Sequence, residues 1–363
     1  MSSKIVILVE GLDSGGIENY LLRFLKETSS NFSEVEIICK SGRIGILEHE
    51  FLAIPKVKIT RFKLGIFNIM QLYKLYYFLK QSKPSTIVDF TGHFAALPIA
   101  IGKMSSIKNR IVFYRNSTDR FKKNFLKDLL IKMFKCLIKK NSTWILANSE
   151  SAFLNYYPSS YRKNKKFKVI YNGINPFEFK ETSKDLALEL DIKENDFVIG
   201  HIGRLNEAKN HKTILKVAIQ LCNEYSNVKF ICCGLSVETL QSSVPDHLKD
   251  RVFLLPFRRD VKNVLATLNC YYFPSLTEGN PNALIEAMLF NIPIVASNIN
   301  PIKECMPDSM FYNLVKPNDD QAACSLLREY INGKPLPFDY KEWAISKFDY
   351  KILFKEFLEI VKG

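Results

Sequence analysis

The sequence predicts an α/β protein of two tandem, doubly wound, Rossmann-like domains, each built on a parallel sheet. Short runs rich in Val, Ile and Phe alternate with longer stretches whose apolar residues recur at helical spacing, a pattern typical of β-α-β units. The alternation stops at a polar segment over 176–196, the expected linker, and then restarts. The length of 363 residues also suits about two domains of ~150 residues each.

The first half alternates strands and helices in a regular order. A strand at the N-terminus leads through a glycine-rich turn into a helix at 17–29, and further helices are predicted at 93–104 and 121–140. The predicted strands of this half cover 4–10, 35–40, 85–90, 109–114, 143–149 and 168–173. These elements predict a first domain over 1–178.

The second half repeats the same order without obvious sequence repetition. Helices are predicted at 211–225 and 281–290, and strands at 197–203, 228–234, 251–257, 270–274 and 293–297. They predict a second domain over 179–340, followed by an amphipathic helix at 349–362 with no strand after it. Two such domains are expected to face each other across a cleft, where the carboxyl ends of their strands bind ligands.

Composition excludes several classes of protein. The apolar runs reach about half of the ~18 residues that span a bilayer, and MSSKIVILVEG is read as a first strand rather than a signal peptide, so we expect a cytoplasmic protein. The eight cysteines include no C-x-x-C pair, which favours buried free thiols over zinc or disulfide sites. D-x-D and the G-x-G-x-x-G and P-loop motifs are absent from the sequence, and its five histidines lack metal-ligand spacing, which predicts no metal site.

The excess of positive over negative charge lies entirely in the first half. Residues 1–185 hold 31 Lys and Arg against 15 Asp and Glu, a net charge of +16, whereas residues 186–363 hold 20 against 22, a net charge of −2. Such a basic half attracts a nucleic acid, an anionic membrane or a phosphorylated substrate. Composition alone does not choose among the three.

Two carboxylates follow a predicted strand in PSLTEGNPNALIEAM. Glu278 lies in the loop before a helix, Pro281 suits the first turn of that helix, and Glu286 lies about one turn inside it. Carboxylates at the carboxyl end of a strand accept hydrogen bonds from sugar or ribose hydroxyls. The alternative is that Glu278 interacts with the helix dipole while Glu286 is solvated.

Cations and glycines follow two other strands. In HIGRLNEAKNHKTIL, Arg204 and Lys209 precede a helix and can converge with its N-terminus on a diphosphate, or they are ordinary surface cations. Gly15 and Gly16 lie in the first strand-to-helix turn, where they permit close backbone approach to an anion or simply form a tight turn.

These motifs, in this order, resemble the retaining GT-B-fold glycosyltransferases of the family 4 (group 1) type. PSLTEGNPNALIEAM carries that family's E-x7-E spacing, HIGRLNEAKNHKTIL resembles its donor-phosphate loop, and GGIENYLLRFL resembles its first-turn glycine motif. VIYNGI resembles the end of its inter-domain strand. The resemblance extends over nearly the whole chain and is densest from 197 to 300.

The resemblance implies roles for these residues. Arg204 and Lys209 would hold the diphosphate of a nucleotide sugar, Glu286 would bind the ribose, and Gly15 and Gly16 would lie near the phosphates. Glu278 and the backbone of Gly279, Asn280, Pro281 and Asn282 would grip the sugar hydroxyls. Residues 341–363 would cross back onto the first domain. Transfer would retain the anomeric configuration without a protein nucleophile, because the diphosphate is stabilised electrostatically and acts as the base.

The sequence departs from the family at one position. Members often carry a His near the donor sugar at the end of the strand predicted at 109–114, where this chain has Arg115, Asn116 and Ser117. His93 either supplies that contact or is a buried structural residue. Arg115 is the other candidate for the active site, and it alternatively contacts an acceptor phosphate.

Two basic stretches of the first half also carry apolar surface. Residues 120–140 hold eight Lys and Arg, one acidic residue, and Phe121, Phe125, Leu129, Met133 and Leu137 at intervals of four. Residues 61–83 add five cations and no acid. Such stretches suit an anionic membrane surface, or they are core helices with a solvated lysine face.

The resulting prediction is a metal-independent, retaining, hexosyltransferase-type enzyme without a cofactor. It would move a sugar from a UDP- or GDP-linked donor to a saccharide acceptor, lipid-linked as is common in the family, in O-antigen, capsule or exopolysaccharide synthesis. It would lie peripherally on the inner face of the cell membrane and bind no nucleic acid, since no recognition motif accompanies the charge. The alternatives are a non-catalytic partner subunit and a sugar-nucleotide epimerase, which would need acid/base groups in the cleft.

Overall fold

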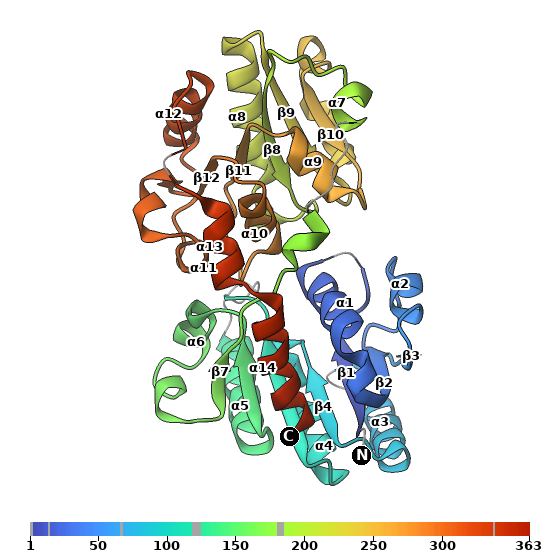
Figure 1. Ribbon diagram of the computed structural model, residues 1–363. Coiled ribbons are helices and arrows are strands. Elements are labelled where there is room, and N and C mark those ends of the chain that lie inside the picture. The colour runs from blue at the N-terminus through green and yellow to red at the C-terminus, as the bar shows by residue number, and fades with distance from the viewer. Residues whose placement is uncertain (1–2, 14, 66–67, 118–124, 180–184, 337) are drawn as a thin grey trace. The chain divides into compact units, whose positions relative to one another are not determined.

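The chain folds into two compact units in the computed structural model (Figure 1), which describes residues 3–13, 15–65, 68–117, 125–179, 185–336 and 338–363. Unit 1 comprises Met1–Gly173 and Tyr350–Gly363, and unit 2 comprises Ile174–Asp349. The division therefore precedes the linker expected at 176–196. The segment that returns to unit 1 starts at Tyr350, later than the predicted 341.

Unit 1 is built on a seven-stranded parallel sheet with the order β3-β2-β1-β4-β5-β6-β7. Its strands are β1 (Ser3–Val9), β2 (Phe32–Cys39), β3 (Val57–Arg61), β4 (Thr86–Asp89), β5 (Asn109–Tyr114), β6 (Trp144–Ala147) and β7 (Phe167–Val169). Since β1 pairs with both β2 and β4, the chain winds outward from β1 in both directions, which makes the sheet doubly wound.

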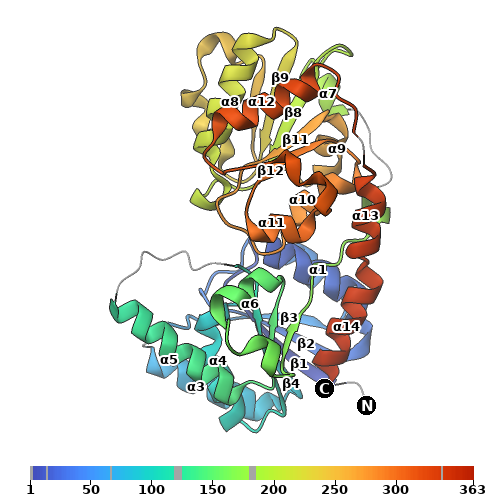
Figure 2. The same cartoon turned by 90° about the vertical axis from the view of Figure 1, so that its left-hand side faces the viewer.

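Helices cover both faces of this sheet. The α-helices of unit 1 are α1 (Gly16–Thr28), α2 (Glu48–Leu52), α3 (Ile69–Ser82), α4 (Ala96–Met104), α5 (Phe125–Asn141), α6 (Glu150–Tyr156) and α14 (Tyr350–Lys362), with short turns η1 (Ser29–Asn31), η2 (Gly92–Ala95) and η3 (Tyr161–Lys163). Helices α1 and α14 share one apolar core with the sheet. Helices α3, α4 and α5 share the other core and lie side by side in Figure 2.

The last helix, α14, is an integral part of unit 1. Its aromatic residues Phe354 and Phe357 contact Tyr20 and Phe24 of α1, with ring centroids 4.7 to 6.1 Å apart. The carbonyl of Val361 accepts a hydrogen bond from Thr86 Oγ1 at 2.7 Å. The predicted return of the C-terminal helix to the first domain is therefore confirmed for α14.

Unit 2 repeats the topology of unit 1 on a six-stranded parallel sheet with the order β10-β9-β8-β11-β12-β13. Its strands are β8 (Phe197–Ile202), β9 (Val228–Cys233), β10 (Val252–Leu255), β11 (Cys270–Phe273), β12 (Ile294–Ser297) and β13 (Leu314–Val315). Strand β8 thus holds the place that β1 holds in unit 1. The predicted fold class of two parallel, doubly wound sheets is confirmed.

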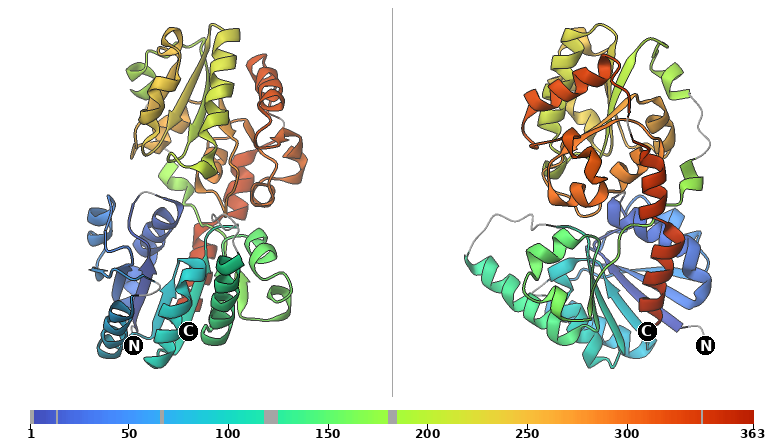
Figure 3. Two further views of the ribbon diagram at one scale, coloured as in Figure 1. Left: turned by 180° about the vertical axis from the view of Figure 1, so that it is seen from behind. Right: turned by 60° about the vertical axis from the view of Figure 1, so that its left-hand side comes forward.

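The helices of unit 2 also cover its sheet. They are α7 (Asp185–Glu189), α8 (His211–Glu224), α9 (Val261–Thr267), α10 (Asn282–Leu289), α11 (Asn300–Cys305), α12 (Asp320–Ile331) and α13 (Tyr340–Lys347), with turns η4 (Pro176–Phe179), η5 (Glu207–Lys209), η6 (Val237–Ser243), η7 (Asp246–Leu248) and η8 (Asp308–Asn313). Helices α8 and α12 share one core with the strands, and Figure 3 shows α8 in yellow-green along the sheet. Helix α13 packs on α10 and stays in unit 2.

Several elements differ from the sequence prediction. Strands β3 and β13 were not predicted, and β7 ends at Val169 rather than at 173. The helix predicted at 121–140 is described from Phe125 onward, so Phe121 lies outside the described residues. All eight cysteines are described as free thiols, and all of them except Cys136 are buried, as predicted.

Candidate functional site

The candidate site of unit 2 lies where the winding of its sheet reverses. Strands β8 and β11 pair in parallel, with Tyr271 opposite Gly200, although about 70 residues separate them. The loop after β8 leads through η5 into α8, and the loop after β11 leads into α10. Since carboxyl ends of parallel strands meet at one edge of a sheet, the two motifs predicted separately are brought together.

The central contact of this site joins Lys209 and Glu278. Lys209 Nζ donates to Glu278 Oε1 at 2.5 Å, and the side chains are only 18% and 10% exposed. The ammonium group also lies 4.8 Å from the ring centroid of Phe273, at the end of β11. A half-buried ion pair at a ligand-binding edge provides a cation for phosphate and a carboxylate for hydroxyls.

Backbone contacts fix the geometry of this pair. The amide of Leu276 donates to the carbonyl of Ala208 at 2.8 Å, which ties the two loops together. Asn210 adopts a left-handed conformation, with φ of 58°, and its Nδ2 donates to the carbonyls of Pro274 at 3.1 Å and Pro317 at 2.8 Å. Asn210 was not predicted as a site residue, and its position between η5 and α8 makes it a positioning residue for Lys209.

Gly203 and Arg204 start the β8 loop, and Gly234 at the end of β9 lies against them. Within the described chain, the half-buried guanidinium of Arg204 makes no hydrogen bond or ion pair. A Cβ atom on Gly234 would lie 2.2 Å from the carbonyl oxygen of Gly203, so a glycine at the end of β9 lets this loop pass. Arg204 is therefore held beside the site by close backbone packing and keeps its donors available.

Glu286 lies inside α10, as predicted, and is buried. Its charge and that of Glu278 both act on Tyr271, whose pKa is raised well above 10.0 chiefly by burial and further by these carboxylates. The hydroxyl of Tyr271 donates to the carbonyl of Ile202 at 3.3 Å. The two predicted carboxylates thus act on one buried group at the β8–β11 edge.

The loop before α10 differs in detail from the prediction. Pro281 is the N-cap residue rather than part of the first turn, and Asn282 begins the helix. Gly279 is buried, and the side chain of Asn280 donates to Cys305 Sγ at 3.0 Å. The amide of Asn280 is therefore engaged by α11, and Cys305 is a supporting residue that sequence reasoning missed.

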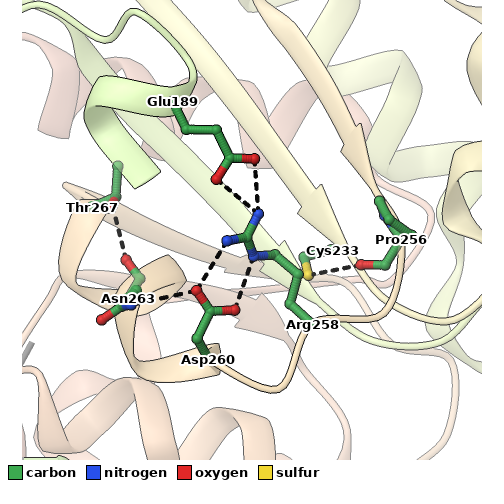
Figure 4. A network of polar contacts seen from close by, with 7 residues as sticks. All are labelled: Glu189, Cys233, Pro256, Arg258, Asp260, Asn263 and Thr267. Carbon is green, nitrogen blue, oxygen red and sulfur yellow. Dashed lines mark hydrogen bonds and ion pairs between the residues drawn. The ribbon is translucent and has the colours of Figure 1, made fainter. Parts of the chain in front are cut away.

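A charged network holds the loop that follows β10 (Figure 4). Arg258 donates through Nε and Nη2 to both oxygens of Asp260 at 2.9 and 3.0 Å, and through Nη1 to Glu189 of α7 at 3.0 Å. Hydrogen bonding to Arg258 lowers the pKa of Asp260 below 3.8. At the base of the loop, Cys233 Sγ donates to the carbonyl of Pro256 at 3.4 Å. These contacts hold the loop after β10 in one conformation in unit 2.

A buried histidine lies beneath the β8 loop. His201 Nδ1 hydrogen-bonds the carbonyl of Tyr272 at 3.0 Å, and its ring stands edge-on to that of His211, with centroids 5.4 Å apart. Burial lowers the pKa of His201 well below 6.5, with smaller contributions from His211 and Lys209. His201 is therefore neutral and structural near pH 7.

The candidate residues of unit 1 lie at the corresponding edge of its sheet. Gly15 is the N-cap of α1, and a Cβ atom on Gly16 would meet nothing within 4 Å. His93 lies in η2 after β4, is buried, and its Nδ1 is 3.0 Å from Tyr114 Oη. These residues again follow adjacent strands, β1 and β4.

His93 and Arg115 line one cavity of about 480 Å³. Its wall is formed by Glu10, Ile17, Glu18, Phe90, Thr91, Gly92, His93, Phe94, Tyr114, Arg115, Asn116, Lys127, Leu130, Ile131, Phe134 and Tyr156. The structure therefore brings together the two residues considered for the histidine position of the family. It also adds carboxylates and aromatic rings that sequence reasoning did not single out.

A buried lysine supports the loop that carries His93. Lys40 Nζ donates to Asp89 Oδ2 at 3.1 Å, to Thr91 Oγ1 at 2.7 Å and to the carbonyl of Phe94 at 3.0 Å. Both Lys40 and Asp89 are buried. Because these three contacts involve residues on both sides of His93, they hold the segment that carries it.

The described residues contain neither a metal-binding cluster nor a membrane-spanning helix. Within them, no group of three His, Cys, Asp or Glu side chains is placed to hold a metal ion. No helix in that part of the chain combines the length and the apolar character needed to cross a bilayer.

Sequence comparison matches both halves of the chain to glycosyltransferase families. Residues 14–177 match the family described as Glycosyltransferase Family 4, and residues 184–347 match Glycosyl transferases group 1. The capsular polysaccharide biosynthesis glycosyltransferase CapH of Staphylococcus aureus is 26% identical over 324 residues, which cover 85% of this chain and 86% of CapH. These matches extend over nearly the full length.

A second relative and a solved structure each match almost all of the chain. The N-acetylgalactosamine-N,N'-diacetylbacillosaminyl-diphospho-undecaprenol 4-alpha-N-acetylgalactosaminyltransferase of Campylobacter jejuni is 25% identical over 359 residues, 95% of this chain and 94% of its own length. Among solved structures, Anabaena HepE in complex with UDP and glucose has a TM-score of 0.79 at 19% identity and covers 99% of both chains. This structural likeness supports the fold.

Proposed function

Because the chain belongs to the group 1 family of GT-B glycosyltransferases, we propose that it transfers a sugar from a nucleoside-diphosphate donor to a saccharide acceptor. The proposed setting is the synthesis of a cell-surface polysaccharide on a lipid carrier. Relatives named for capsular polysaccharide biosynthesis and for a diphospho-undecaprenol acceptor support this setting. The 2.5 Å contact between Lys209 and Glu278 is the observation that carries the proposal.

In the proposed donor site, the diphosphate competes with Glu278 for Lys209. Lys209 and Arg204 then neutralise the diphosphate, and the carboxylate of Glu278 turns to the sugar hydroxyls. The buried Glu286 accepts hydrogen bonds from the ribose. Gly15 and Gly16 are assigned to the phosphates, and the backbone of Gly279 to Asn282 is assigned to the sugar.

We propose that transfer retains the anomeric configuration. The bond between the sugar C1 and the diphosphate oxygen breaks, the acceptor oxygen bonds to C1 on the same face, and the acceptor proton passes to the departing diphosphate. Arg204 and Lys209 stabilise the negative charge that develops on the leaving group. His93 or Arg115 contacts the substrates from unit 1.

A thermal-shift panel of UDP- and GDP-linked sugars, with magnesium or with EDTA, tests the donor site. We expect one UDP-sugar to raise the melting temperature equally under both conditions, since UDP occupies the related HepE structure. A shift that requires magnesium would contradict metal independence. No shift with any nucleotide sugar would contradict the proposed function and favour a non-catalytic subunit.

The acceptor is proposed to be lipid-linked, with the enzyme bound peripherally to the inner face of the cell membrane. Helix α5 exposes Phe125, Leu126, Leu129 and Met133 beside a series of lysines, and Phe125 is 81% exposed. Helix α3 exposes Ile69, which is 79% exposed, with Met70 and Tyr73. Apolar side chains next to lysines suit an anionic bilayer surface.

Vesicle sedimentation tests the membrane proposal. We expect binding to anionic vesicles that weakens with salt and that falls in the double variant Phe125→Ser/Leu129→Ser. The control is Leu188→Ser, which removes an apolar side chain that is 82% exposed in unit 2. Equal loss in both variants, or equal binding to neutral vesicles, would contradict the proposal.

A further inference from the structure

The cavity of unit 1 contains a buried cation that forms no ion pair within the described part of the chain. Arg115 follows β5, lines the cavity, and is only 6% exposed. Its Nε and Nη1 atoms have no hydrogen-bond acceptor among the residues that the structure describes. Glu10 and Glu18 line the same cavity, and the charge of Glu18 acts on Arg115, but no ion pair joins either carboxylate to Arg115 within the described chain.

Aromatic rings hold the guanidinium group of Arg115 in place. Its Cζ lies 4.0 Å from the ring centroid of Tyr20 and 4.9 Å from that of Phe113. Stacking against a ring leaves the N–H groups, which lie in the guanidinium plane, directed past the rings rather than into them. The buried hydroxyl of Tyr20 interacts with the guanidinium group of Arg115, but a neutral hydroxyl does not neutralise its charge.

Such an arrangement is costly unless a ligand completes it. Burying a charge without a partner destabilises a folded protein, and here burial lowers the pKa of Arg115 to about 10. Glu18 and Tyr20 oppose this shift only in part. Charged groups kept in such surroundings are typical of functional sites.

We infer that this cavity binds an anionic group, a carboxylate or a phosphate, of the sugar acceptor, with Arg115 as its cationic hydrogen-bond donor. The inference rests on the proposed function and specifies the acceptor class. Ile17, Phe94, Leu130 and Phe134 give the wall apolar surface for the neighbouring part of the ligand. The anion is either the phosphate of a lipid carrier or the carboxylate of an acidic sugar.

Calorimetry on the wild-type chain separates these two sources. The probes are farnesyl diphosphate with farnesol as its neutral partner, and glucuronic acid with glucose, while UDP reports on unit 2. We expect one anionic probe to bind at least about tenfold more tightly than its neutral partner. UDP binding without any preference for an anionic probe overturns this inference alone, whereas loss of UDP binding overturns the proposed function.

Variants then locate the anion. Arg115→Met is expected to bind the anionic probe about 10- to 100-fold more weakly than the wild type. It should unfold at no lower temperature, since the substitution removes a buried charge. Arg162→Gln, which replaces an exposed arginine paired with Glu150, should change neither property. A lower melting temperature with unchanged anion binding would make Arg115 structural and overturn the inference.

Two further outcomes of the Arg115→Met experiment bear on the inference. A loss of UDP affinity in folded Arg115→Met would place Arg115 at the donor diphosphate and overturn the acceptor assignment. If Arg115→Met fails to fold, Arg115→Lys takes its place, because it keeps the charge but loses the planar fork. About tenfold weaker anion binding supports the inference in that case, and unchanged affinity overturns it.

Discussion

The ion pair between Lys209 and Glu278 should serve both stability and donor binding, and a double-mutant cycle can separate the two. In Lys209→Met, the carboxylate of Glu278 stays 10% exposed without its cation. Breaking this half-buried pair should cost about 3 kcal/mol of unfolding free energy, the lower end of the range for fully buried pairs, which corresponds to a fall in melting temperature of about 6–12 °C for a domain of this size. Glu278→Gln removes the second charge, so the double variant Lys209→Met/Glu278→Gln should recover most of that loss.

The double variant should recover stability but not its affinity for the donor. Lys209 is expected to contribute a charge-assisted contact to the diphosphate of about 1.5–3 kcal/mol, so both Lys209→Met and the double variant should bind UDP about 10- to 100-fold more weakly. Urea unfolding measures the stability and calorimetry with UDP measures the affinity. Recovery of UDP affinity in the double variant, or no recovery of stability, would refute the reasoning.

Three more predictions concern single residues of unit 2. Glu286→Ala should weaken UDP binding by about 1.5–3 kcal/mol in calorimetry, because the ribose loses a buried charged acceptor. Unchanged UDP affinity would show that Glu286 does not bind the donor. Gly234→Ala should cost about 1–3 kcal/mol in urea unfolding, since its Cβ would lie 2.2 Å from the carbonyl oxygen of Gly203; a stability equal to wild type would show that the loop yields freely. Burial lowers the pKa of His201 well below 6.5. As the pH is lowered through 6.5, His201 therefore takes up a proton in the unfolded chain but not in the folded one. The free energy of unfolding should then decrease by up to ~1.4 kcal/mol for each pH unit. His201→Asn should flatten this slope in denaturation curves between about pH 5 and 6.5, and a slope identical to wild type would contradict it.

The alternation of apolar runs was sufficient to predict the fold class, because buried parallel strands are almost continuously apolar. It missed β3, whose sequence VKITR includes exposed Lys58 and Arg61 and which pairs only with β2 at the edge of the sheet. An edge strand of this kind lacks the apolar run that marks its inner neighbours. The two-residue strand β13 is too short for any periodic signal.

The sequence allowed the individual residues of the candidate site to be predicted, but not the contact between Lys209 and Glu278. Lys209 and Glu278 each belong to a motif, whereas their meeting depends on β8 lying beside β11, which is a property of strand order. Asn210 and Cys305 act through side-chain contacts made after folding, and neither residue type signals them locally. Spacing in α5 gave a row of apolar residues, but only packing shows that Phe134 and Ile138 face the core while Phe125 and Leu129 remain exposed.

The position of α14 has a consequence for the order in which the protein is made. The last helix of the chain completes the core of the unit that is synthesised first, through Phe354 and Phe357 against α1. During translation, unit 2 leaves the ribosome with every strand it needs, while unit 1 waits for residues 350–363. A stop codon in place of Tyr350 should therefore destabilise unit 1, whose other residues end at Gly173, and leave unit 2 folded.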